Sequence, residues 1–110
     1  MNRGTAVLIL FLAALFEAGG DALIRVALHR PSGSLRIFSF LLGAALLFAY
    51  GYTVNSPPWD FGRLLGLYVV FFFVIAQAIA WIGFGQRPSP AVLCGGLLIV
   101  SGGVVIAWFQ

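Results

Sequence analysis

Three ionisable residues, Glu17, Asp21 and Arg25, lie on one face of the first hydrophobic segment. Each step of four residues turns a helix by only about 40°, so the three side chains form one slightly slanted stripe. The preceding run, residues 7–16, is apolar enough to enter a lipid bilayer. A carboxylate at the centre of a membrane helix costs roughly 2.5–3.5 kcal/mol. A chain that carries one there usually uses it to bind an ion or a proton.

The free energy of inserting this first segment is close to zero. About twelve strongly apolar residues contribute roughly −5 kcal/mol, and two deep, ionised carboxylates oppose them with roughly +5 to +6 kcal/mol. The helix therefore needs partner helices, or a carboxyl group that takes up a proton. Because Glu17 lies near mid-span with no cation one turn before it, we expect it to carry a proton. Asp21 and Arg25 have two possible roles. They form an ion pair that neutralises both charges, or Asp21 acts as a second carboxylate that tunes the Glu17 site.

The composition is that of a membrane protein. Of 110 residues, 62% are hydrophobic and 8% are charged, whereas a soluble domain has about 25% charged residues. Short polar breaks separate four apolar stretches, at about residues 5–28, 37–54, 61–84 and 91–109. Each stretch is long enough to cross roughly 30 Å of hydrocarbon. The sequence predicts an all-α integral membrane protein, with residues 1–110 forming one domain of four transmembrane helices. A signal peptide fits the first segment less well, because Glu17 and Asp21 interrupt it.

Several function classes are not expected. The chain has no nucleophile–base set, phosphate loop or metal-ligand spacing, and Cys94 is its single cysteine, so we expect neither an enzyme nor a resident cofactor or metal. The net charge of +3 comes from arginines in loops and at helix ends, where they meet lipid headgroups rather than nucleic acid. With four spans, both termini lie on one side of the membrane. The arginines near that side are Arg3 and Arg63, against Arg30, Arg36, Arg87 and a snorkelling Arg25 on the other. So small a bias is compatible with insertion in both orientations.

Other residues are candidates for the site or for assembly. In the third span, Tyr68 could line a site, and Gln77 is a mid-membrane polar group that should hydrogen-bond inward. Tyr50 and Tyr52, near the end of the second span, fit an interfacial aromatic belt. Glycine pairs repeat seven residues apart in the fourth span and predict a helix-docking surface for a dimer. These glycines are Gly95, Gly96, Gly102 and Gly103. The alternative is that they pack within one monomer.

A family resemblance rests on three features of the chain. One is the membrane-embedded Glu17 in Phe16-Glu17-Ala18, with Arg25 two turns later. The second is the stretch Trp81-Ile82-Gly83-Phe84-Gly85-Gln86-Arg87, and the third is Gly95-x6-Gly102 in the fourth span. In these features the chain resembles the small multidrug resistance family of the drug/metabolite transporter superfamily. The similarity spans essentially the whole chain.

The resemblance implies a transport mechanism and an assembly. It implies an antiparallel, dual-topology homodimer in the bacterial cytoplasmic (inner) membrane, whose two central Glu17 residues bind substrate or protons in alternation. The proton is then the coupling ion, and the cargo is a small organic cation or amphiphile. Departures from the family pattern indicate a divergent branch with its own substrate. Asp21 takes a usually neutral position, Leu65 replaces a Tyr, and Tyr68 stands where drug exporters carry Trp.

Three functions stay open. The leading hypothesis is a proton-coupled exporter in which protonated Glu17 releases cargo and ionised Glu17 binds it, with alternating access by rocking at the dimer interface. The second is a lipid-carrier flippase subunit of the same superfamily, for which Arg25, Arg63 and Arg87 would matter more than Glu17. The third is a small non-transporting regulatory or scaffold protein, in which Glu17 is an assembly contact.

Overall fold

The computed structural model describes residues 2–109, and this part of the chain forms helices α1 (Arg3–Leu28), α2 (Ser34–Val54), α3 (Phe61–Phe84) and α4 (Pro90–Trp108). All four are long and apolar enough to cross a membrane. The predicted all-α membrane fold with four spans is therefore confirmed. The third helix has the expected bounds, and α2 begins three residues before its apolar stretch, at Ser34 rather than residue 37.

Local sequence explains where the helices begin and end. The Asn2 side chain accepts a hydrogen bond from the backbone N–H of Thr5 at 2.7 Å, which caps the start of α1. Ser89 caps α4 in the same way, and Pro90 follows it at the first helical position. At the end of α3, Gly85 takes the left-handed conformation with φ of 67°, which residues with a Cβ rarely adopt.

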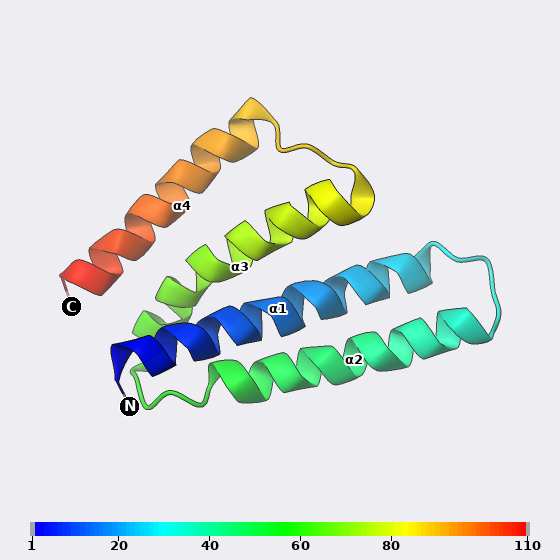
Figure 1. The fold of residues 1–110 in the computed structure, drawn as a ribbon, viewed down its shortest axis with the longest axis horizontal. Helices are drawn as coiled ribbons and strands as arrows, with labels where there is room; N and C mark the ends of the chain where they lie inside the picture. Colours follow the sequence, from blue (N-terminus) through cyan, green and yellow to red (C-terminus); the bar gives the residue numbers. More distant parts are fainter. Residues whose placement is uncertain (1, 110) are drawn as a thin grey trace.

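Successive helices run in alternating directions and make a flat molecule (Figure 1). The pair α1 and α2 lies side by side, α3 packs on α1, and α4 packs on α3 at the outer edge. The chain measures 50 × 34 × 19 Å. Because one dimension is so short, a single chain encloses little, and apolar side chains of α4 stay exposed. They include Leu93, Leu97, Leu98, Val104 and Val105.

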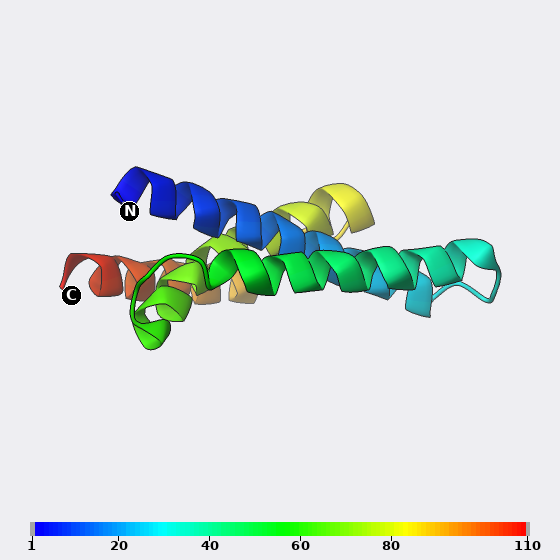
Figure 2. The same ribbon diagram turned by 90° about the horizontal axis from the view of Figure 1, so that it is seen from below.

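Two glycines let α1 and α2 cross in close contact (Figure 2). A Cβ on Gly20 would lie 2.9 Å from the Leu47 side chain and 3.0 Å from the carbonyl oxygen of Gly43. A Cβ on Gly43 would lie 2.9 Å from Ile24 and 3.1 Å from the carbonyl oxygen of Gly20. Small residues permit such close backbone approach, which membrane helices use for packing. This crossing fixes the position of α2 beside the middle of α1.

The buried core lies toward the end of the molecule that holds both termini (Figure 1). On α1 it consists of Leu10, Ala13 and Ala14, which are fully buried. The alanines let α3 approach α1 closely, and Leu64 and Tyr68 of α3 pack on them. Glu17 follows Ala13 by one helical turn. The core therefore ends where the charged stripe of α1 begins.

Candidate functional site

The structure brings Glu17 and Tyr68 together across 51 positions of sequence. The Tyr68 hydroxyl donates a hydrogen bond to Oε1 of Glu17 at 2.7 Å. Tyr68 is only 4% exposed, while Glu17 is half-buried at the edge of the core. A hydrogen bond to an ionised acceptor is stronger than one between neutral groups. The bond therefore offsets part of the cost of placing a carboxylate in the middle of a membrane helix.

Two further aromatic rings adjoin Tyr68. The centroid of the Tyr50 ring lies 5.4 Å from that of Tyr68, with the planes tilted by 32°, and Phe72 lies at 6.4 Å with a tilt of 34°. The interpretation of Tyr50 as an interfacial residue is wrong. The crossing of α1 and α2 turns Tyr50 inward onto α3. Tyr52, by contrast, is 75% exposed, as an interfacial residue would be.

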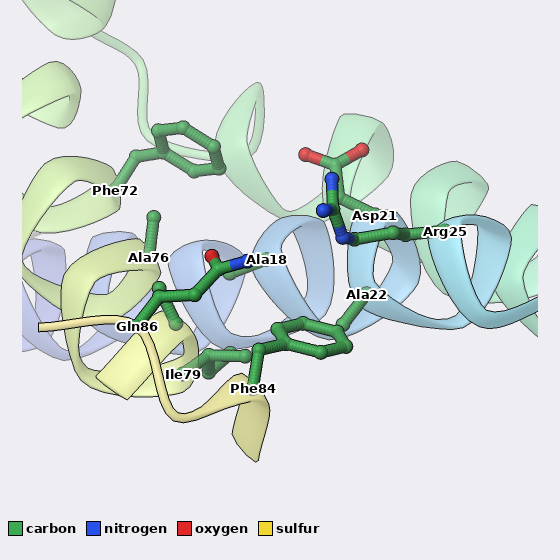
Figure 3. Close-up of a pocket in the computed structure, with 10 residues that line it drawn as sticks. Ala18, Asp21, Ala22, Arg25, Phe72, Ala76, Ile79, Phe84 and Gln86 are labelled. Atoms are coloured by element: carbon green, nitrogen blue, oxygen red, sulfur yellow. The ribbon is translucent and has the colours of Figure 1, made fainter. Parts of the chain in front are cut away.

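Next to this cluster, a cavity of about 270 Å³ opens between α1 and α3. Figure 3 shows its lining. Its polar residues are Asp21 and Arg25 of α1 and Gln86 of the loop after α3. Its remaining walls are apolar or aromatic, formed by Ala18, Ala22, Phe72, Ala76, Ile79, Ala80 and Phe84. Phe72 both lines the cavity and adjoins Tyr68, so it links the cavity to the Glu17 pair.

The two charged residues of the cavity lie one helical turn apart. The Arg25 guanidinium lies over the Phe84 ring, 5.5 Å from its centroid, where a cation is attracted to the aromatic face. Asp21 lies on the Glu17 side of Arg25 (Figure 3). Both side chains are exposed in the single chain. A bound cation would therefore meet negative charge near Glu17 and positive charge toward the loop end.

Gln77 does not belong to this site. It lies nine residues after Tyr68 on the same helix, which places the two on opposite faces, about 180° apart. Its neighbours one and two turns earlier, Phe73 and Val70, contact α4. The prediction that Gln77 shares a site with Glu17 is corrected accordingly, because α3 uses that face for packing.

The four glycines of α4 divide between two faces. Gly96 and Gly103 are buried, and a Cβ on either would collide with Phe73 or Val70 of α3. Gly95 and Gly102 have nothing within 4 Å of a Cβ position. The expectation of one dimer surface is therefore corrected for Gly96 and Gly103, which pack within the chain. Within residues 2–109, Gly95 and Gly102 make no such contact with α3.

Sequence reasoning missed four residues near the site. Phe72 follows Tyr68 by one turn, so helical spacing alone could have indicated it. Tyr50, Phe84 and Gln86 reach the site through the crossing of α1 and α2 and the course of the loop after α3, for which the sequence has no local signal.

Residues 2–109 contain no group of three His, Cys, Asp or Glu side chains that could hold a metal ion. The chemistry that this arrangement can perform is reversible binding of a proton or a cation.

In comparisons with known proteins, no family model matches the chain, and no solved structure matches it. It is similar over nearly its whole length to bacterial proteins described as UPF0060 membrane proteins. One from Herpetosiphon aurantiacus is 31% identical over 106 residues, covering 94% of each chain. One from Streptomyces avermitilis is 33% identical over 99 residues, covering 87% of this chain and 84% of the relative. One from Clostridium beijerinckii is 30% identical over 105 residues, covering 94% and 92%.

Proposed function

Since the chain belongs to the UPF0060 family of membrane proteins, we propose that it is a proton-coupled exporter of a small cationic or amphiphilic compound. Its cargo and its protons compete for Glu17. The resemblance to the small multidrug resistance family supports the same function.

One observation carries this proposal: the mid-membrane carboxylate of Glu17 is held by Tyr68 beside a cavity of about 270 Å³. Tyr68 engages one carboxylate oxygen and leaves the other for a proton or a cation. Ionisable residues within membrane spans commonly mark ion or proton pathways. Phe72 and Phe84 supply apolar and aromatic surface for an amphiphile, while Asp21 adds a second negative charge for a cation.

The transport cycle follows from the two protonation states of Glu17. The ionised carboxylate attracts a cationic cargo. Protonation removes that charge, so the cargo leaves and the proton travels in the opposite direction. Alternating access requires that the cavity open to each side of the membrane in turn. The proton and the cargo each shift the balance between the two access states only if they bind one of these states more tightly than the other.

The proposed assembly is an antiparallel, dual-topology homodimer in the bacterial inner membrane. A single chain is only 19 Å thick in its shortest dimension, and its cavity lies open at Asp21 and Arg25. A second copy would bring another Glu17 and close the pathway. Gly95 and Gly102 on α4, with the exposed apolar residues around them, suit the contact between copies.

The test is a proton-coupled current in liposomes that contain the purified protein. A panel of small organic cations is applied under an imposed pH gradient, with Glu17→Gln as the key variant. Glutamine keeps a carbonyl oxygen to accept the Tyr68 hydrogen bond but cannot ionise. Asp60→Asn is the matched control, because Asp60 is exposed at the start of α3 and lies outside the cavity.

We expect a cargo-dependent current that Glu17→Gln abolishes and Asp60→Asn retains. Cargo binding should weaken as the pH falls in the wild type, and should depend less on pH in Glu17→Gln, where Asp21 is the carboxylate that is left in the cavity. A current indifferent to Glu17, or no current for any cation, would contradict the proposal. The lipid-carrier flippase or the non-transporting regulatory protein would then be the better reading.

A further inference from the structure

A second cavity lies at the opposite end of α1 from Asp21, and the proposed transport cycle makes no use of it. It has a volume of about 290 Å³. Its lining comes from the start of α1, the start of α3 with the residue Trp59 before it, and the end of α4. These helix ends lie at the same end of the molecule (Figure 1). The lining residues of the cavity are Arg3, Val7, Trp59, Arg63, Leu67, Ala107 and Trp108.

Arg63, which lines this cavity, carries a buried hydrogen-bond donor that is unpaired. Its guanidinium lies over the Trp59 ring, 5.1 Å from the centroid. Its Nε atom is buried without an acceptor in the described residues, 2–109. A buried, charged donor without an acceptor is costly. No acceptor at Nε therefore balances the charge of the Arg63 guanidinium, and an anionic ligand in the cavity would balance it.

The charged side chains that line the cavity are both positive. They belong to Arg3 and Arg63, and among residues 2–109 no acidic side chain lines it. Asp60, the acidic residue closest in sequence to Arg63, precedes α3 but is not part of the lining. Both arginines lie in the first turn of their helices, where the helix dipole favours anions, while the end of α4 brings the opposite dipole to the same cavity.

The position along the membrane normal selects the type of anion. The lining residues come from the ends of three spanning helices, so the cavity lies at the level of the membrane–water interface. Trp59 and Trp108 fit this level, and Trp108 is 78% exposed. Val7 and Leu67 lie one turn further into their spans and give the cavity an apolar floor. Phosphate groups are the anions concentrated at this depth.

We propose that this cavity binds a phosphate group, presented by an anionic lipid headgroup or by a soluble phosphate. Arginine suits this ligand because its planar guanidinium binds two phosphate oxygens at once. Arg3 is on α1 and Trp108 is on α4, two helices that both pack on α3. A bound phosphate would therefore also hold the end of α4 against α1.

The experiment uses tryptophan fluorescence of the purified protein in a non-ionic detergent. The chain has three tryptophans, and Trp59 and Trp108 line the cavity. The background variant Trp81→Phe therefore leaves only the two that report on it. Three probes are titrated separately: dihexanoyl phosphatidylglycerol, dihexanoyl phosphatidylcholine and inorganic phosphate. Arg63→Gln and Arg3→Gln test the site, and Arg30→Gln is the control, because Arg30 lies in the loop between α1 and α2.

We expect a saturable fluorescence change with phosphatidylglycerol or phosphate, and affinity about ten- to a hundredfold lower in Arg63→Gln. Arg3→Gln should also weaken binding, and Arg30→Gln should not. Saturation by inorganic phosphate would identify a soluble ligand, and saturation by phosphatidylglycerol alone would identify a lipid headgroup. No saturation with any probe, equal binding of the zwitterionic lipid, or affinity unchanged in both Arg63→Gln and Arg3→Gln would overturn the proposal. Because binding is measured without transport, the result is independent of the proposed export function.

Discussion

The Tyr68 hydroxyl donates its hydrogen bond to Oε1 of Glu17 across 2.7 Å, and this contact joins α3 to the middle of α1. It connects the buried core, to which Tyr68 belongs, with the charged stripe of α1. Because Tyr68 is almost fully buried, its hydroxyl has few alternative partners. The pair therefore serves both the packing of α3 on α1 and the placement of the carboxylate.

Replacing Tyr68 by Phe should weaken both the fold and the site. The ring is retained, but the Glu17 carboxylate loses its donor, at a cost of about 1.5–3 kcal/mol for a bond to a charged group. We expect a lower midpoint of thermal unfolding in detergent and weaker cargo binding. Tyr52→Phe is the matched control, because it removes the same hydroxyl group from a tyrosine on α2 that is exposed. Equal midpoints for the two variants would show that the hydrogen bond contributes nothing to stability.

Asp21→Asn should lower the affinity of the cavity for a cation, and Arg25→Gln should raise it, because the two substitutions change the charge of the cavity in opposite directions. Asp21→Asn removes a negative charge beside the proposed site, and Arg25→Gln removes the positive charge that lies over Phe84. At an effective dielectric constant near 20, each change is worth up to about 3 kcal/mol at 6 Å, or roughly a hundredfold in affinity. Calorimetric titration with a cation that the protein transports measures both. A shift of the same sign in both variants would rule out an electrostatic role for this pair.

Gly20→Ala should destabilise the contact between α1 and α2. The added Cβ would lie 3.0 Å from the backbone oxygen of Gly43, which cannot move without displacing the helix. Overpacking costs about 1–3 kcal/mol, more than the roughly 0.5–1 kcal/mol that alanine gains over glycine in a helix. Gly51→Ala, on α2 with open space around it, should be neutral or stabilising. Thermal unfolding of the two variants compares them directly, and equal stabilisation of both would refute the close crossing.

Adjacent glycines of α4 should respond differently to substitution. Gly103→Ala places a methyl group against Val70 and should lower the thermal unfolding midpoint, because α3 and α4 must separate. Gly102→Ala meets open space in the single chain and should leave that midpoint unchanged or raise it. If the homodimer forms through this face, Gly102→Leu should shift the protein from dimer to monomer in light scattering. An unchanged dimer would place the contact between copies elsewhere.

The sequence alone determined the class of the protein and the number of its spans. Composition and four apolar stretches of membrane-spanning length suffice for this, because a bilayer requires helices of about twenty apolar residues. The caps at Asn2 and Ser89 and the turn at Gly85 are equally local. Glu17 and Tyr68 were both identified as candidates, since polar groups are conspicuous in apolar spans.

Only the tertiary structure decided how these residues meet. Helical periodicity assigns residues to faces but does not say which face meets which helix. It therefore could not show that Tyr50 turns inward or that Gln77 lies opposite Tyr68. The same limit divided the glycines of α4, because Gly96 and Gly103 differ from Gly95 and Gly102 only in which side of the helix α3 covers. Contacts between distant segments depend on the rotation and crossing of whole helices, and close approaches such as that of Gly20 and Gly43 fix these in three dimensions.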